Sequence, residues 1–216
     1  MKCLLVLILT LLPLLSSGQG IRFTAFADPQ ITWLRPVNRM IESDGIRAGI
    51  DAGFEMDYFF SENYAFSTGL SINNLGGRLK FQQSFPIQFQ DFTQNIDPGN
   101  TVIYRLHYVN LPLGMKFTTR EIGYTTVFVK LGSTAHFNIR SNADIPAHRI
   151  ENESLENEIE PFIFSYNFSA GIQYSLGGQT AVVGGIEYKH RFIDIMTNPG
   201  YKALLNSIAL RLGILF

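Results

Sequence analysis

Cysteine is almost absent from this sequence, whose 216 residues include only Cys3. A chain with one thiol, close to its start, cannot build a disulfide framework or a cysteine metal site. An excess of charge of either sign is also missing, because 17 basic residues stand against 18 acidic ones and the formal net charge is −1. This balance provides no basic surface for nucleic acid, so we expect no nucleic-acid partner.

Long hydrophobic runs are lacking as well, apart from CLLVLILTLLPLL at residues 3–15. This run follows Lys2 and precedes the small and polar SSGQG, an order typical of a secretory signal peptide. It is too short for a membrane-spanning helix, which takes roughly 20 apolar residues. We predict a signal peptide at residues 1–19, cleaved after Gln19, and a single mature domain at residues 20–216. Cys3 would leave with the signal, so no lipid anchor on cysteine is expected.

What the mature chain does have is alternation of apolar and polar residues with a period of two. Residues 46–58, 161–177 and 180–192 show it clearly, and residues 21–34, 64–75, 101–118 and 124–140 show it less regularly. The ending NSIALRLGILF, residues 206–216, alternates too and finishes on the aromatic Phe216. Such alternation predicts β-strands with one apolar and one polar face, eight in all.

The connections between these strands alternate in length. Short breaks fall at residues 61–63, 119–123 and 177–179, and long ones at 35–44, 83–100, 141–160 and 193–202. Tight turns at one end and long loops at the other are typical of up-and-down barrels of the outer membrane. We therefore predict an all-β fold, an eight-stranded antiparallel transmembrane β-barrel with both termini in the periplasm. The alternative is a soluble lipocalin-like barrel that binds a small ligand, with its apolar face inside.

The composition of the two faces favours the membrane barrel. The polar face combines small residues with charges of both signs, which suits the filled lumen of an eight-stranded barrel. The apolar face carries aromatic residues near the strand ends, as expected for girdles at the two membrane interfaces: Tyr58, Tyr64, Phe66, Phe117, Phe162, Phe164, Tyr188 and Phe192. We expect a structural lumen charge network of Arg47, Asp51, Glu55, Lys116, Lys130, Glu187, Lys189, Arg191 and Arg211, although the same residues also fit an ion path.

Three stretches of the chain resemble a known family. YVNLPLGMKF (residues 108–117), GGIEYKHRFIDI (184–195) and the NSIALRLGILF ending are similar to the PorT-like outer-membrane β-barrel proteins of Bacteroidetes, although Asn110 stands where an acid is expected. The resemblance covers the mature chain and implies an outer-membrane barrel, with a link to type IX secretion by analogy. The alternating ending with Phe216, Ile214 and Leu212 resembles the signal that such barrels present to the barrel-assembly machinery.

Candidate catalytic residues are few. The histidines, His107, His136, His148 and His190, have no partner at zinc-ligand spacing. By parity His190 faces lipid and Ser207 faces the lumen, so they cannot meet in a catalytic triad. His136 is expected inside the barrel near Lys130 and Arg140. We expect neither catalysis nor a cofactor or metal.

Two of the predicted loops are candidate binding sites. The acidic loop at 141–160 is expected to be solvated, with Ca²⁺ bridging to lipopolysaccharide as an alternative; its acids are Asp144, Glu151, Glu153, Glu156, Glu158 and Glu160. The loop at 83–100 is expected to expose Phe85, Ile87, Phe89 and Phe92 to a protein partner. The sequence thus favours an integral outer-membrane scaffold, in contact with lipid and lipopolysaccharide, over a small-solute channel.

Overall fold

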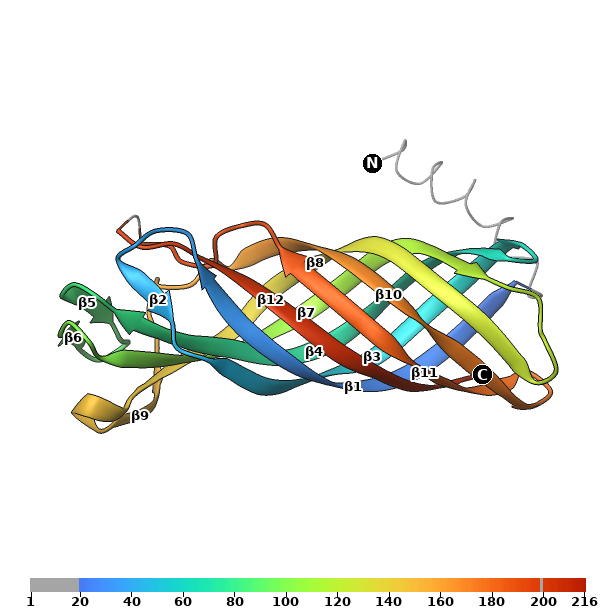
Figure 1. The fold of residues 1–216 in the computed structure, drawn as a ribbon, viewed down its shortest axis with the longest axis horizontal. Helices are drawn as coiled ribbons and strands as arrows, with labels where there is room; N and C mark the ends of the chain where they lie inside the picture. The colour runs from blue at the N-terminus through green and yellow to red at the C-terminus, as the bar shows by residue number, and fades with distance from the viewer. Residues whose placement is uncertain (1–19, 199) are drawn as a thin grey trace, which may run out of the picture.

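The computed structural model describes residues 20–198 and 200–216, so the predicted signal peptide lies outside the described residues. Eight long antiparallel strands form the wall, and β1 closes it by pairing with β12 (Figure 1). The all-β barrel predicted from the alternation is therefore confirmed. The strands are β1 (Ile21–Pro36), β3 (Ile46–Ser61), β4 (Tyr64–Phe81), β7 (Thr101–Thr118), β8 (Thr125–Ile145), β10 (Phe162–Gly177), β11 (Thr180–Arg191) and β12 (Ala203–Leu215).

The two ends of the barrel differ. Short turns join β3 to β4, β7 to β8 and β10 to β11 at the end where Gly20 and Phe216 lie, and we call this the short-turn end. The long connections leave from the opposite, long-loop end. Since β4, β7 and β8 have 18, 18 and 21 residues, they are longer than the roughly 11 residues that a tilted strand needs to cross a bilayer.

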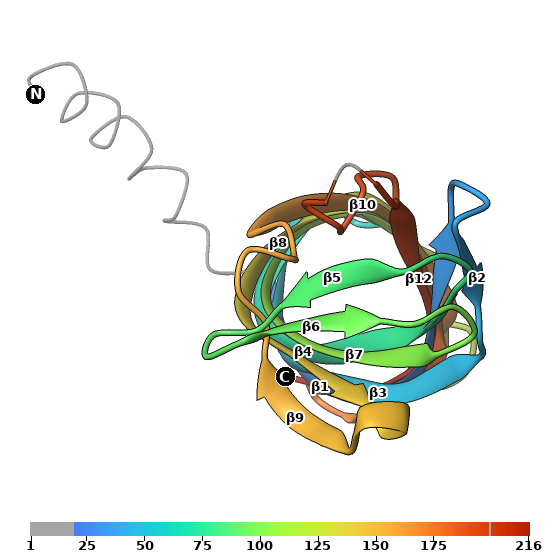
Figure 2. The same cartoon turned by 90° about the vertical axis from the view of Figure 1, so that its left-hand side faces the viewer.

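Additional elements gather at the long-loop end. The short strands β2 (Ile41–Ser43) and β9 (Ile150–Ser154) extend the wall by pairing with β4 and β8, and a 3-10 turn at Pro146–His148 precedes β9. The strands β5 (Phe85–Gln88) and β6 (Thr93–Ile96) form a separate hairpin. Figure 2 shows this hairpin lying across the mouth of the barrel. The long loops therefore fold together over one opening.

The outer face of the wall is apolar. Residues such as Phe54, Leu70, Leu113 and Ile186 are each more than half exposed on it. Aromatic pairs mark both ends of this surface, Phe23 with Phe216 near the short turns and Phe137 with Phe162 toward the long loops, at ring-centroid distances of 6.3 and 4.9 Å. This exposed apolar face is the reverse of the lipocalin-like alternative. Among the described residues, no helix is long and apolar enough to cross a membrane.

The polarity of both the outer and the inner face of the wall changes part-way along a strand. On β7, the outward side chains are apolar at Leu113 and Leu111 but polar at His107 and Arg105 nearer the long loops. The inward positions change in the opposite sense, from Lys116 and Asn110 to a run of buried apolar and aromatic residues, Tyr108, Leu106, Tyr104 and Val102. The barrel is therefore polar inside where its outer face is apolar, and apolar inside beyond that level.

Candidate functional site

Ten charged side chains fill the lumen within the apolar-faced part of the barrel, and we call this group the ion core. Five are acidic and five are basic, so their formal charges cancel, and each is at most 6% exposed. Six of the eight wall strands contribute. The members are Asp28, Asp51, Glu55, Asp57, Lys116, Lys130, Glu187, Lys189, Arg191 and Arg211.

Glu55 on β3 is the most heavily paired acid of the ion core. It accepts hydrogen bonds from Lys130 and, at 2.7 Å, from Nη2 of Arg211, and Lys116 Nζ lies 3.9 Å away. Lys116 also donates to Asp57 at 2.5 Å. Burying such charges is expensive unless every one has a partner, and here three cations converge on two neighbouring acids.

A second set of pairs lies around Lys189 on β11. Its Nζ is 2.6 Å from Asp51 Oδ2 and 3.0 Å from Glu187 Oε2. Arg211 joins the two sets, since its Nη1 is 3.7 Å from Glu187 Oε1 and its Nε is 3.9 Å from Asp28 Oδ2. Asp28 also accepts the backbone N–H of Leu212 at 2.9 Å, at a point where the β1–β12 ladder is interrupted. The ion core thus ties the closing strands to the rest of the wall.

Arg191 differs from the other members of the ion core in its lack of an acidic partner among the described residues. It is fully buried, yet in the part of the chain that the structure describes it forms no salt bridge. Its Nη1 donates to Ser207 Oγ at 3.4 Å, and its Nε and Nη2 have no hydrogen-bond partner among the described residues.

A layer of neutral polar groups continues from the ion core toward the long-loop end. Asn73 and Asn110 each donate to Asp51 Oδ2, at 3.1 and 3.2 Å. The ring of His136, fully buried, bridges Asn110 Oδ1 at 2.6 Å and Ser165 Oγ at 2.8 Å. This layer extends the hydrogen-bonded network across β3, β4, β7, β8 and β10.

The lumen is closed on the short-turn side by apolar residues. Phe128, Ala181, Val183 and Leu215 form a small buried cluster there. Lys116 Nζ lies 5.1 Å from the centre of the Phe128 ring, a cation–π contact that joins this plug to the ion core. A cleft of about 160 Å³ at the mouth leads to these residues.

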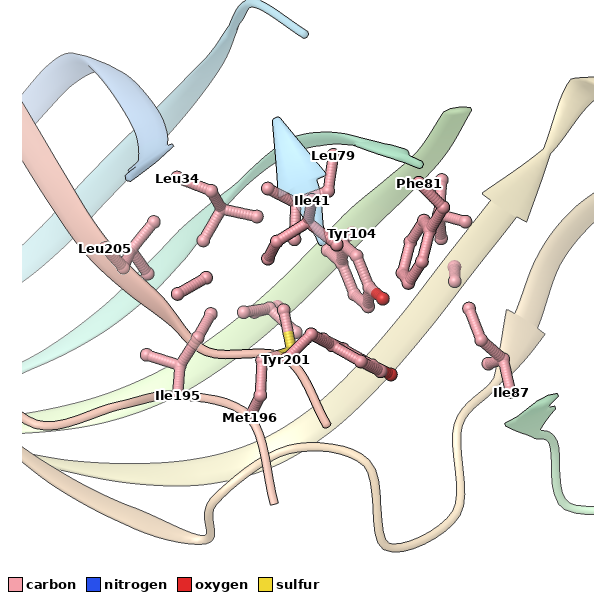
Figure 3. Close-up of a cluster of buried hydrophobic side chains, with 14 of the residues drawn as sticks. Leu34, Ile41, Leu79, Phe81, Ile87, Tyr104, Ile195, Met196, Tyr201 and Leu205 are labelled. Carbon is pink, nitrogen blue, oxygen red and sulfur yellow. The ribbon is translucent and has the colours of Figure 1, made fainter. Parts of the chain in front are cut away.

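On the long-loop side, the lumen is closed by an apolar cap of twenty buried residues from the strand ends and the loops. Figure 3 shows both Tyr104 and Tyr201 within this cluster, with Ile41 and Leu79 drawn near Tyr104 and Met196 near Tyr201. The hairpin β5–β6 and the loop before β12 cover the cluster, with the Phe81 and Tyr201 rings 5.1 Å apart. The described lumen is therefore filled by three layers: the plug, the ion core with its polar neighbours, and the cap.

One buried carboxylate fastens the long loops together. Glu158 accepts the backbone N–H of Gln88 at 3.0 Å and the hydroxyl of Tyr201 at 2.8 Å, and its own carbonyl accepts the N–H of Thr197 at 3.1 Å. The loop after β9 is thereby bound both to the β5–β6 hairpin and to the loop before β12. No sequence signal distinguished Glu158 from the other acids of its loop.

Seven of the nine residues predicted for the lumen charge network form the salt bridges described above, and Arg191 is buried beside them. Arg47 is the one that the prediction misplaced. It lies half-buried in the wall, and its Nη1 donates to Asn74 Oδ1 at 3.1 Å and to Leu75 O at 2.7 Å. The reason is that β3 separates from β4 above Ile50, which leaves the Leu75 carbonyl without a strand partner. Asp28 and Asp57 belong to the ion core although the network prediction omitted them; the alternation that located Glu55 also points to both.

The prediction for the loop at 83–100 was wrong. Ile87 and Phe89 are buried, at 0 and 2% exposure, and Phe85 is half-buried against the cap, whereas Phe92 is 40% exposed. The alternation in this loop does form a hairpin, but the hairpin folds inward because the cap offers its apolar face a core. A row of exposed apolar residues is therefore not available to a partner at this loop.

The acidic loop is only partly free. Asp144 is bound by Arg105 at 2.5 Å and Glu158 is buried, whereas Glu151, Glu153 and Glu156 are exposed. Within residues 20–198 and 200–216, no three His, Cys, Asp or Glu side chains are grouped so that they could hold a metal ion.

The structure separates His190 from Ser207, as parity predicts. His190 lies on the outer face with its Nδ1 2.5 Å from Asn206 Oδ1, while Ser207 is buried in the lumen. His136 faces inward, but the expectation that Arg140 lies beside it was wrong, because a bulge in β8 places Arg140 on the outer face opposite His107. Ile214, Leu212 and the terminal Phe216 all point outward.

The comparisons with known proteins agree with this geometry. Residues 19–198 match the family model described as outer membrane protein beta-barrel domain. The chain belongs to this family. It is thus an integral outer-membrane β-barrel protein, and the apolar outer face is its lipid-facing surface. No curated protein matches the sequence significantly.

The solved structures that resemble this outer-membrane barrel in fold include the following two. Neisserial surface protein A, from Neisseria, is 12% identical with a TM-score of 0.50, over 89% of this chain and 95% of that one. OprG from Pseudomonas aeruginosa is 10% identical with the same TM-score, over 91% and 94%. At such identities the likeness concerns the fold alone, and the narrower PorT-like resemblance stays a prediction.

Proposed function

We propose that this outer-membrane barrel is a sealed structural and interaction scaffold, neither a channel nor an enzyme. One observation carries the proposal: the lumen is filled along its length by the plug, the ion core and the cap. A conducting pore needs a continuous polar path, whereas here the polar ion core lies between two apolar layers. The separation of His190 from Ser207 speaks against the lipid-side triad that the sequence raised.

The orientation follows from the two ends. Outer-membrane barrels place short turns in the periplasm and long loops outside, so both termini of this chain would be periplasmic and the cap would face the exterior. The outward Leu212, Ile214 and Phe216 would then lie on the periplasmic side of the barrel and serve as the signal read by the barrel-assembly machinery.

Partners would meet the barrel at its exposed loops. The outer side of the cap presents Phe92, 40% exposed, and the loop at 141–160 presents Glu151, Glu153 and Glu156. A protein with a basic surface complements these three acids. A role in type IX secretion rests on the PorT-like resemblance, and loss of secreted proteins from the surface of cells that lack this chain would support it.

Electrical recordings test the sealed scaffold most directly. Protein extracted from outer membranes and inserted into planar bilayers should give no reproducible conductance steps, while the unboiled protein should show heat-modifiable mobility on a denaturing gel, as a folded barrel does. Regular conductance steps, or cleavage of lipid A by the purified protein, would contradict the proposal. A protein that stays soluble and shows no mobility shift would contradict membrane insertion itself.

A further inference from the structure

A row of polar and basic side chains crosses the outer face of the wall. Asn74, His107 and Arg140 are paired side by side on β4, β7 and β8, and Arg47 reaches the row from β3 through its 3.1 Å hydrogen bond to Asn74. We call Arg47, His107 and Arg140 the basic row. It covers three inter-strand steps of about 4.8 Å each, or roughly 14 Å of the barrel's circumference.

The basic row lies where the outer face changes from apolar to polar. The next outward row toward the short turns consists of Ile72, Val109 and Phe137, paired in register with one another, and Ile72 and Phe137 are 60% and 45% exposed. The lumen changes from polar to apolar at the same level, from Asn110 to Tyr108. Two independent features of the chain thus place the basic row at the depth of the lipid headgroups.

The charge of the basic row is not neutralised by the protein. In the described part of the chain, neither Arg47 nor Arg140 has a carboxylate within salt-bridge distance; their hydrogen bonds go to amide and carbonyl oxygens. By contrast Arg105, one step farther out, is paired with Asp144. Two arginines at one level of the outer face therefore carry positive charge that an external anion can pair with. An external anion would pair with the charges of the basic row, as the acids of the ion core pair with its lysines and with Arg211.

A cleft of about 390 Å³ adjoins the row at Arg140. It forms where the segment after β9 stands away from β8. Ile139, 58% exposed, gives the cleft an apolar side that continues into the lipid-facing surface. Leu155, Ile159 and Pro161 add to this apolar side, and amides and hydroxyls suited to sugar hydroxyl groups also line the cleft, from Asn138, Ser141, Ser154 and Asn157.

We infer that the basic row and this cleft bind the phosphorylated sugar headgroup of an outer-leaflet lipid. Phosphate lies against Arg140 and His107 with Arg47 beside them, the sugar occupies the cleft, and the acyl chains run along Ile72 and Phe137. The inference rests on the proposed orientation, in which the long loops face the exterior, and it specifies which surface of the scaffold holds lipopolysaccharide.

Binding of fluorescent lipid A to the purified full-length barrel in phosphatidylcholine nanodiscs tests the inference. Replacing Arg140 by Gln should weaken binding about tenfold, since the phosphate loses a charge-assisted hydrogen bond, and R47Q/R140Q should weaken it further. Arg120→Gln is the matched control, because Arg120 is an arginine 87% exposed at the short-turn end. Lipid A stripped of phosphate should bind the wild type as weakly as lipid A binds the double variant.

Three results would overturn the inference: equal binding by R140Q and wild type, an equal loss in R120Q, or displacement of lipid A by millimolar inorganic phosphate, which would indicate a free-anion site. The heat-modifiable shift of each variant is measured in parallel, since Arg140 is exposed and its replacement should leave the barrel folded. Loss of that shift in the wild type would instead refute membrane insertion.

Discussion

The ion core and the apolar cap occupy the same barrel and are built on the same strands, yet they are stabilised in opposite ways. The ion core has ten buried charges, nine of them in salt bridges, whereas the cap has twenty buried apolar or aromatic residues and one principal buried acid, Glu158. The outer surface explains the difference. Where the wall faces lipid, its apolar residues gain by pointing outward, and where it faces water, they gain by pointing inward.

Each of the two interiors depends on a different force. Lipid leaves the membrane-level part of the chain little hydrophobic driving force to fill the lumen, so pairing and hydrogen bonding must hold its interior together. The cap resembles the core of a soluble protein and depends on apolar burial and packing. Disrupting each interior should therefore have distinct consequences.

The largest effect is expected from removing the central acid of the ion core. Replacing Glu55 by Gln leaves Lys130 and Arg211 buried beside a neutral amide, because Glu55 is the hydrogen-bonded acid they share. Losing one partner of a buried ion pair costs about 3–5 kcal/mol. The free energy of unfolding in lipid vesicles, from urea titration followed on unboiled gels, should fall by that amount. Glu62→Gln, at a side chain 83% exposed in a short turn, is the control and should change it little. Equal stability of E55Q and wild type would show that the ion core does not stabilise the barrel.

The next effect compares two leucines on one strand. Leu106 is fully buried in the cap, and Leu111, five residues along β7, is 48% exposed on the lipid face. Leu106→Ala opens a cavity in packed side chains and should cost about 2–4 kcal/mol. Leu111→Ala replaces one lipid contact by another and should cost much less. Urea unfolding of both variants measures the difference, and equal losses would mean that the cap is not packed as a core.

The same strand shows how much of this fold the sequence could predict. Strands whose outer face stays apolar, such as β10, alternated clearly, and their sidedness was correct. On β4 and β7 the apolar residues move from the outward positions to the inward ones near Asn74 and His107, so one window averages two opposite patterns. These were among the strands that alternated less regularly. The shift of apolar residues from outward to inward positions was the signal that the sequence analysis missed. That shift predicts an apolar interior at the long-loop end, and hence the cap and the inward fold of the loop at 83–100.

The salt bridges were partly predictable for the same reason. Parity along a strand gives the face of Glu55 or Lys189, so the inward charges were found from alternation alone. It gives no information on where a strand leaves its neighbour or bulges, which is why Arg47 and Arg140 were misplaced. The role of Glu158 depends on three loops meeting in space, and no local pattern encodes that meeting.

A smaller effect is expected at Glu158, the buried and hydrogen-bonded acid of the cap. Glu158→Gln keeps the shape of the side chain but weakens its bonds to Gln88 and Tyr201, at a cost of about 1–2 kcal/mol. The loops should open while the membrane-level barrel stays folded. Protease cleavage within residues 82–100 should become faster and the heat-modifiable shift should remain. Glu156→Gln, exposed in the same loop, is the control. Cleavage at the wild-type rate would show that Glu158 does not fasten the loops.

The smallest effect separates the two interiors by pH. Burial raises the pKa of Tyr201 well above its ordinary value of about 10, and the neighbouring Tyr104 and Glu158 act in the same direction. A raised pKa means that the cap keeps its full stability below about pH 10 and loses it as the pH rises further, because only the opened cap releases the proton. The loss should be about 1.4 kcal/mol per pH unit for one such group. Hydrogen exchange of the backbone amides of residues 82–100 at pH 9 and pH 11, corrected for the intrinsic exchange rate at each pH, measures this loss of protection. Tyr201→Phe should reduce the difference in protection between the two pH values. A wild-type cap equally protected at both values would mean that Tyr201 ionises as easily in place as in the opened cap, and that its burial contributes nothing to closing the loops.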